Sequence, residues 1–128
     1  MEGSALKAFT KSPSDGIACE DVIKCVLAIS EEGWGIFHHL VKKGPTRVDD
    51  VAEYLGKDRS TAYRELHKLI NCGICTKEQN SIKEGGYYFL YQSKDVEKIR
   101  EETEKCIDAT YDQLKQAIKS NFSFSSSD

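Results

Sequence analysis

The sequence lacks the features that would place it in a membrane or outside the cell. Its 128 residues contain no apolar run that approaches the ~20 residues of a membrane span. The residues after Met1 also lack the charged and then apolar pattern of a signal peptide. We therefore expect one soluble cytoplasmic chain with no membrane partner, and its length suits a single domain.

Motifs of catalysis and of cofactor binding are also absent from the sequence. It contains no nucleophile elbow, phosphate-binding loop, HExxH motif or paired-carboxylate signature. His38 and His39 point about 100° apart on one predicted helix, so they do not converge with His67 on a metal. We expect no enzyme, no cofactor and no metal, and we interpret the histidines as structural or surface residues.

Cysteine is scarce and odd in number: Cys19, Cys25, Cys72, Cys75 and Cys106. That count does not suit a disulfide scaffold, so we expect mostly free thiols in a reducing compartment. Cys72 and Cys75 form a Cys-x-x-Cys pair that can be structural, switch redox state or, lacking a second pair, less readily bind zinc. Cys106 is a further redox candidate, able to face its own copy in a dimer. Packing is the favoured interpretation for all three.

Positive charge is not in excess, because the formal net charge is −3. This argues against a polycation, but the charge is unevenly distributed along the chain. Residues 57–68 carry a net charge of +2, whereas residues 95–128 carry −3. A local basic segment in an acidic chain is compatible with DNA binding of modest, salt-sensitive affinity.

Hydrophobic periodicity predicts four short helices in the first part of the chain. Ser30, Thr46 and Asp58 are the expected N-caps, and glycines follow three of the helices. The predicted helices cover residues 19–29, 31–43, 48–55 and 59–71.

The period changes after Gly73 to that of β-strands. Residues 74–78 and 87–91 are the expected strands of a hairpin, with a polar turn at 80–86. Residues 95–120 contain no glycine or proline, and they predict a final helix roughly 40 Å long. The fold class is mainly α with a small antiparallel β-hairpin: a winged helix-turn-helix plus a long C-terminal dimerisation helix.

These elements imply four segments. We expect a winged helix-turn-helix DNA-binding domain at 15–93 and a dimerisation helix at 94–121. Segments 1–14 and 122–128 have the composition of flexible tails.

The helix predicted at 59–71 has a polar face that could read DNA. In a helix-turn-helix the second helix can lie in the major groove. The residues expected to make groove contacts are Arg59, Ser60, Thr61, Tyr63, Arg64 and His67. Lys57 and Lys68 are expected to contact phosphates, Lys83 to act from the wing, and Thr46 to belong to the same surface. The alternative is a merely solvated helix face.

The final helix carries two apolar rows at spacings of three and four residues, as in a coiled coil. Two copies packed together would bury both rows and create a homodimer. The residues expected in the interface are Val96, Ile99, Thr103, Cys106, Ile107, Thr110, Tyr111, Leu114 and Ile118. The alternative is that the helix folds back on Trp34 and Phe37 of its own chain.

Three stretches carry a family resemblance: GPTRVDDVA at 44–52, DRSTAYREL at 58–66 and GGYY at 85–88. With them the sequence resembles archaeal winged-helix transcription regulators of the TrmB type and, more loosely, of the MarR type. The resemblance extends over about 25–121 and implies a homodimer that binds double-stranded operator DNA. Larger TrmB-type proteins carry a separate sugar-binding domain, and this chain ends after one long helix, so no sugar effector is expected. Two alternatives remain, a winged-helix module that binds proteins and a thiol-based redox-sensing regulator.

Overall fold

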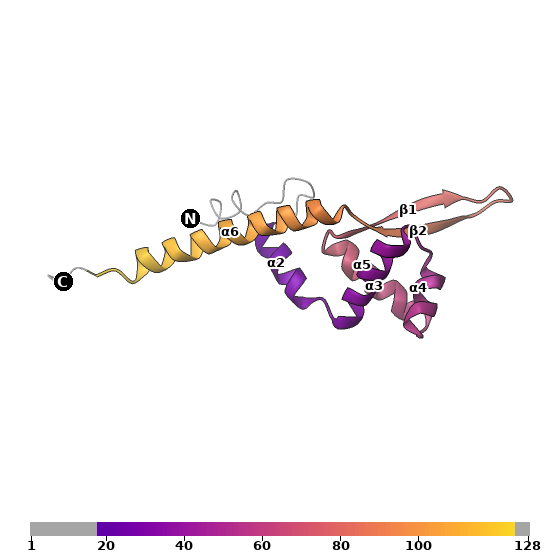
Figure 1. Cartoon of the computed structure of the whole chain (residues 1–128), viewed down its shortest axis with the longest axis horizontal. Coiled ribbons are helices and arrows are strands. Elements are labelled where there is room, and N and C mark those ends of the chain that lie inside the picture. The colour runs from indigo at the N-terminus through magenta and orange to yellow at the C-terminus, as the bar shows by residue number, and fades with distance from the viewer. Residues whose placement is uncertain (1–17, 125–128) are drawn as a thin grey trace.

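The computed structural model describes residues 18–124, which form a small helical body with a long helix on one side and a hairpin on the other (Figure 1). The fold is mainly α with one two-stranded antiparallel hairpin, which confirms the predicted fold class. Along the chain the elements are α2 (Cys19–Ala28), α3 (Glu31–Lys43), α4 (Val48–Leu55), α5 (Arg59–Asn71), β1 (Cys75–Ser81), β2 (Tyr87–Ser93) and α6 (Val96–Asn121). No helix in this part of the chain is long and apolar enough to cross a membrane.

Three helices begin at side-chain caps. The hydroxyl of Ser30 accepts a hydrogen bond of 3.0 Å from the backbone N–H of Gly33 at the start of α3. The carboxylate of Asp58 does the same for Thr61 at 2.9 Å, and Asp95 caps α6. These bonds satisfy N–H groups that the first helical turn leaves without a partner. The caps predicted at Ser30 and Asp58 are therefore confirmed.

Thr46 does not cap α4, contrary to the sequence-based expectation. Its hydroxyl donates instead to the carbonyl oxygen of Gly44 at 2.7 Å, and Arg47 occupies the N-cap position without a side-chain hydrogen bond. The backbone of Thr46 pairs with Tyr91 of β2 through N–O distances of 2.9 and 2.8 Å. Thr46 thus fastens the hairpin to the loop between α3 and α4.

The core lies where α3, α4 and α5 meet the base of the hairpin. Spacings of three and four residues place apolar side chains on the inner face of each helix. The largest fully buried side chains are Tyr91, Ile36, Leu40, Leu66, Leu69, Val51 and Cys75. This packing fixes the orientation of α5, so its opposite face points to solvent.

The hairpin extends well beyond the core (Figure 1). Its register runs from Cys75 opposite Ser93 to Ser81 opposite Tyr87. The turn at 82–86 ends in Gly85 and Gly86, whose φ angles of 106° and 89° lie in a region that favours glycine. Each strand continues two or three residues past its predicted end, because cross-strand hydrogen bonds need no buried face to persist beyond the core.

Helix α6 lies beside α2 rather than beside α3 (Figure 1). Its 26 residues span about 39 Å at 1.5 Å per residue, and Cys106 is its buried residue. Ile99 packs against the edge of the core. The alternative in which α6 folds back mainly on Trp34 and Phe37 is therefore not what the structure shows.

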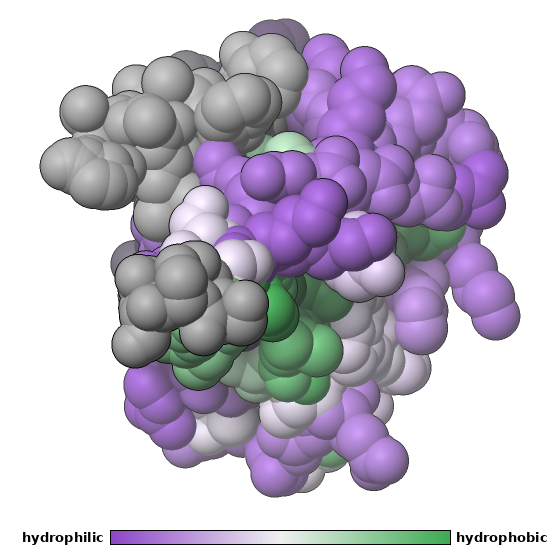
Figure 2. Space-filling view, turned by 90° about the vertical axis from the view of Figure 1, so that its left-hand side faces the viewer, coloured by the Kyte–Doolittle hydropathy of each residue, from purple (hydrophilic) through white to green (hydrophobic). Residues whose placement is uncertain are grey.

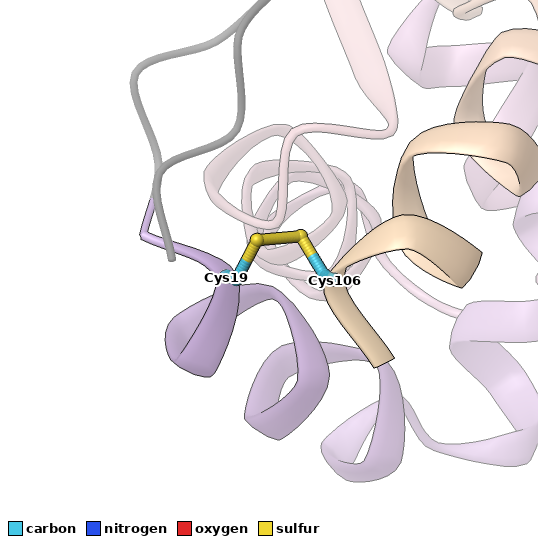
Figure 3. Close-up of a disulfide and its surroundings, with 2 residues drawn as sticks. All are labelled: Cys19 and Cys106. Carbon is cyan, nitrogen blue, oxygen red and sulfur yellow. A yellow bond between two sulfur atoms is a disulfide. The ribbon is translucent and has the colours of Figure 1, made fainter. Parts of the chain in front are cut away.

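Four of the five cysteines are paired, which corrects the expectation of mostly free thiols. Cys19 is bonded to Cys106 (Figure 3) and Cys25 to Cys72, while Cys75 is free and buried. Cys72 therefore pairs with α2 and not with Cys75, and Cys106 is bonded within its own chain and not to a copy. The bonded pairs are 87 and 47 residues apart, and no local pattern reveals contacts at such separations.

The tails expected at 1–14 and 122–128 lie outside the described residues, apart from residues 122–124. Those three are exposed beyond the end of α6.

Candidate nucleic-acid interface

A tight turn sets the angle between α4 and α5. Gly56 ends α4 in the left-handed conformation, with φ 69° and ψ 30°. A side chain there would meet no atom within 4 Å, so the conformation and not the space requires glycine. The N–H groups of Gly56 and Lys57 close the last turn on the carbonyl oxygens of Glu53 and Ala52, both at 3.1 Å.

Asp58 then starts α5 as a charged cap. The hydrogen bonds that it accepts from Thr61 hold the pKa of the Asp58 carboxyl below its ordinary value. The carboxylate lies at the positive end of the helix dipole, which favours the ionised form. The helix start is thereby fixed in place.

One face of α5 is buried and the other is open to solvent. Ala62, Leu66 and Leu69 are at most 1% exposed. On the opposite side, one shallow surface pocket is lined by Arg59, Ser60, Tyr63 and Arg64. These are four of the six residues predicted to contact bases, and the structure brings them together on one exposed surface, which we call the α5 face.

The side chain of Arg64 is tied back to the preceding turn of α5. Its guanidinium donates a hydrogen bond of 3.3 Å to the hydroxyl of Thr61, one turn earlier. Thr61 is half-buried, so it supports Arg64 as well as lying next to the α5 face. A planar guanidinium in such a position can make two parallel hydrogen bonds to a guanine edge or to a phosphate.

The other basic side chains around the α5 face form ion pairs. Arg59 lies 3.3 Å from Asp49 of α4, and Lys68 lies 3.1 Å from Glu65. Lys57 pairs with Glu32 of α3, and this hydrogen bond raises the pKa of Lys57.

In these three pairs the basic side chains stay exposed to solvent and can still bind another anion. The basic partner of each pair has a side chain that is 47% exposed or more. Exposed ion pairs contribute little to stability. A phosphate can therefore replace the carboxylate of Glu32 or Asp49 at little cost, whereas the side chain of Glu65 is only 14% exposed.

His67 occupies a different position from the one predicted for it. Its ring lies 4.2 Å from the ring of Tyr63 and 6.4 Å from that of Tyr91, half-buried beneath the hairpin. Burial, and then the charge of Lys77, lowers the pKa of His67. His67 packs α5 against the wing and is not on the exposed surface that Arg64 occupies.

Thr46 is buried where the loop between α3 and α4 meets the hairpin. It is 4% exposed, and its hydrogen-bonding groups are engaged with Gly44 and Tyr91. This burial does not favour the predicted contact of Thr46 with DNA. A threonine just before a predicted helix is a typical N-cap residue. The sequence pattern does not show that the hydroxyl of Thr46 donates to the preceding loop instead.

The wing presents basic and aromatic groups together. Lys83 lies in the exposed turn, as predicted. Two further basic residues were missed by the sequence analysis: the guanidinium of Arg47 lies 4.2 Å above the ring of Tyr88, and the ammonium of Lys77 lies 4.6 Å from the ring of Phe89. Lys77 lies diagonally across the hairpin from Phe89, a cross-strand neighbour that the alternation of the strands could have indicated.

The residues predicted for the dimer interface divide into two groups. Cys106 is bonded to α2, Thr110 lines a groove between α2 and α6, and Thr103 and Ile99 line a cavity at the base of α6. These four face their own chain, so the expectation that they lie between two copies is not supported.

The second group is exposed along α6. Ile107, Tyr111, Leu114 and Ile118 are 49–59% exposed, and Val96 is 42% exposed at the helix start. Figure 2 looks toward the C-terminal end of α6 and shows hydrophobic surface gathered in a patch among hydrophilic residues. We call Ile107, Tyr111, Leu114 and Ile118 the outer row, of which Leu114 also lines the edge of the groove between α2 and α6.

A helix-turn-helix followed by a two-stranded wing defines the winged helix-turn-helix class of proteins. The chain belongs to the TrmB family, since the family model described as "Sugar-specific transcriptional regulator TrmB" matches residues 24–106. Family and fold together support DNA-binding regulation, and they confirm the resemblance drawn from the sequence.

Individual solved structures and a sequence relative are similar to this chain. A solved structure described as a possible transcriptional regulator from Methanosarcina mazei Go1 is similar at a TM-score of 0.65 and 26% identity, over 82% of this chain and 89% of that one. The ST1889 protein from Sulfolobus tokodaii has the same fold, at a TM-score of 0.54 and 19% identity over 77% of this chain and 93% of that one. The uncharacterized protein MJ1503 of Methanocaldococcus jannaschii is 27% identical over 113 residues, which is 88% of this chain and 86% of the relative.

Proposed function

We propose that the protein is a transcription regulator that binds specific double-stranded DNA as a homodimer, with α5 in the major groove. The observation that carries this proposal is the α5 face. Four polar side chains lie together on the solvent side of a capped helix whose other side is fixed in the core. A rigid helix with such a face suits the reading of base edges.

Each group on this surface has a role that follows from its chemistry. Arg64 would contact a guanine or a phosphate in a two-pronged fashion. Ser60 lies in the first turn of α5, where N–H groups and the helix dipole favour a phosphate. Lys57 and Lys68 would exchange Glu32 and Glu65 for phosphates. Lys83 and Arg47 would contact the phosphate backbone of the DNA beside the wing.

The outer row supports the proposed dimer. Its members follow one another at intervals of four, three and four residues along α6, the spacing of a helix-packing seam. They lie on a helix that extends away from the winged-helix body (Figure 1). A second copy packed against this row would give a twofold axis and two α5 helices, which matches a palindromic site.

The proposal is tested by selecting DNA fragments from the source genome with the full-length protein. We expect enrichment of fragments that share a palindromic sequence, with affinity that falls steeply as salt is raised. Enrichment without any shared sequence would contradict specific recognition. Failure to retain any DNA would favour the alternative of a module that binds other proteins.

A further inference from the structure

Helix α2 is covalently joined to two elements that have different tasks. Cys25 is bonded to Cys72, the residue that ends α5. Cys19 is bonded to Cys106, in the part of α6 that precedes the outer row (Figure 3). One short helix therefore connects the proposed reading helix to the proposed dimerisation helix.

Helix α2 packs along α6 but buries few of its own side chains. Only Cys19 and Val22 are buried among its ten residues, and Leu27 is 81% exposed. Ile29, just after the helix, packs against the edge of the core. On the other side, Cys106 is the buried residue of α6. The two disulfides therefore add covalent links to packing that buries little of α2.

We propose that the Cys25–Cys72 and Cys19–Cys106 bonds form a thiol–disulfide control site, which holds α5 at a fixed angle to α6 when oxidised and releases it when a dithiol reduces the bonds. This inference rests on the proposed function, because the quantity under control is the affinity for palindromic DNA.

The Cys25–Cys72 bond is the more accessible of the two. Cys25 is half-buried, and a surface pocket of about 260 Å³ is lined by Cys25, Cys72, Ser30 and Lys68. Cys72 is 7% exposed, and Cys19 and Cys106 are 4% and 3% exposed, although Cys106 lines a cavity of about 230 Å³, so the difference rests on Cys25. We therefore expect the bond to α5 to be reduced before the bond to α6.

The reaction is an ordinary exchange with an external dithiol. One thiolate of the dithiol attacks the sulfur of Cys25, forms a mixed disulfide and expels Cys72 as a thiolate, which takes up a proton. The second thiol of the reductant then closes its own disulfide and releases Cys25. The protein bond gains two electrons and two protons, and the dithiol loses them.

Cys75 does not compete in this exchange, although it is only three residues from Cys72. Its side chain is 1% exposed, and burial raises the pKa of the Cys75 thiol to about 12. The thiol remains protonated near neutral pH, and a protonated thiol is a poor nucleophile. The Cys25–Cys72 bond is thereby protected from reshuffling within the chain.

Release of α2 should weaken DNA binding through loss of preorganisation. The half-sites of a palindrome lie about one helical turn, 34–36 Å, apart, so both α5 helices of a dimer must be held at one spacing. With α2 detached at either end, the winged-helix body can change its angle to α6. Binding to DNA must then fix this angle, and the free-energy cost of doing so weakens the affinity.

The first test measures α2 without reference to DNA. Hydrogen exchange of the full chain is followed by mass spectrometry, oxidised and after treatment with dithiothreitol. We expect amides of α2 to exchange at least about tenfold faster after reduction, while those of α3 and α5 keep their protection. Equal exchange of α2 in both forms would overturn the inference.

The second test measures affinity for a selected palindrome by fluorescence anisotropy. We expect reduction to raise the Kd of the wild type about tenfold. The Cys25→Ser/Cys72→Ser and Cys19→Ser/Cys106→Ser variants should bind weakly before reduction, and Cys75→Ala should respond like the wild type. Circular dichroism checks that each variant is folded.

The outcomes separate the two proposals. Binding that is equal in the oxidised and reduced forms would overturn the control site and leave the proposed function intact. Absence of specific binding in both forms would overturn the proposed function itself.

Discussion

The winged-helix body and the α2–α6 pair are stabilised in different ways. In the body, residues of α3, α4, α5 and the hairpin form one continuous buried core. In the pair, only Cys19, Val22 and Cys106 are buried, two disulfides make the connections, and the outer row faces solvent. A buried core fixes one shape, whereas covalent links and an exposed apolar row leave the geometry dependent on redox state and on a partner.

The largest expected effect tests the difference in burial with one type of side chain. Leu66 is fully buried in the body, and Leu27 on α2 is 81% exposed. We expect Leu66→Ala to lower the free energy of unfolding by about 2–5 kcal/mol. Leu27→Ala should change it by less than about 0.5 kcal/mol. Urea titration measures the free energy of unfolding of both variants. An equal loss for Leu27→Ala and Leu66→Ala would mean that α2 is part of the core.

The next effect concerns the outer row. A lysine in place of Leu114 would have to be buried between two copies, which would forfeit the ~1.5–3 kcal/mol that a buried leucine contributes in each chain. We expect Leu114→Lys to raise the dimer dissociation constant at least about tenfold in sedimentation equilibrium. Gln116→Lys, on the same helix but outside the outer row, adds the same charge as a control. An unchanged dissociation constant of the Leu114→Lys dimer would show that Leu114 lies outside the dimer interface.

A smaller effect is expected at the wing. Lys83→Ala should weaken binding to all DNA sequences alike and lower the slope of log affinity against log salt by about 1. Binding isotherms at several salt concentrations measure both quantities. A loss restricted to the selected palindrome would instead mean that Lys83 reads bases.

The smallest effect concerns the cap of α5. The hydrogen bonds from Thr61 lower the pKa of Asp58 in the folded chain from its ordinary value of 3.8. Its contribution to stability is therefore present above that ordinary value and is lost as the pH falls through the lowered pKa. Asp58→Asn keeps a capping oxygen but cannot titrate. The stability advantage of the wild type over Asp58→Asn should shrink below about pH 4, and a gap that widens there would contradict the assignment.

The body could be predicted from the sequence because its signals are local. Ser30, Gly44, Gly56 and Asp58 mark helix ends through contacts with residues three or four positions away. The polar residues of the α5 face follow from the same periodicity, because a helix with one buried side must expose the other.

The α2–α6 pair could not be predicted in this way. The apolar rows of α6 were visible, but only three-dimensional contact shows that Cys106 faces Cys19, 87 residues earlier. For the same reason the sequence did not distinguish a row that faces α2 from a row that faces solvent. The expectations for Thr46 and His67 did not take account of the hairpin, distant in sequence, which pairs with the backbone of Thr46 and whose Tyr91 ring lies 6.4 Å from the ring of His67.

The most direct measurement of the central claim compares Arg64→Ala with Lys24→Ala. Each variant loses one positive charge, but Lys24 lies on α2, outside the α5 face. The Kd of each is measured on the selected palindrome and on a scrambled duplex. The account predicts that Arg64→Ala loses about 1–3 kcal/mol on the palindrome and discriminates less between the two duplexes, whereas Lys24→Ala discriminates as the wild type does. Undiminished discrimination by Arg64→Ala would contradict the claim that the α5 face reads DNA.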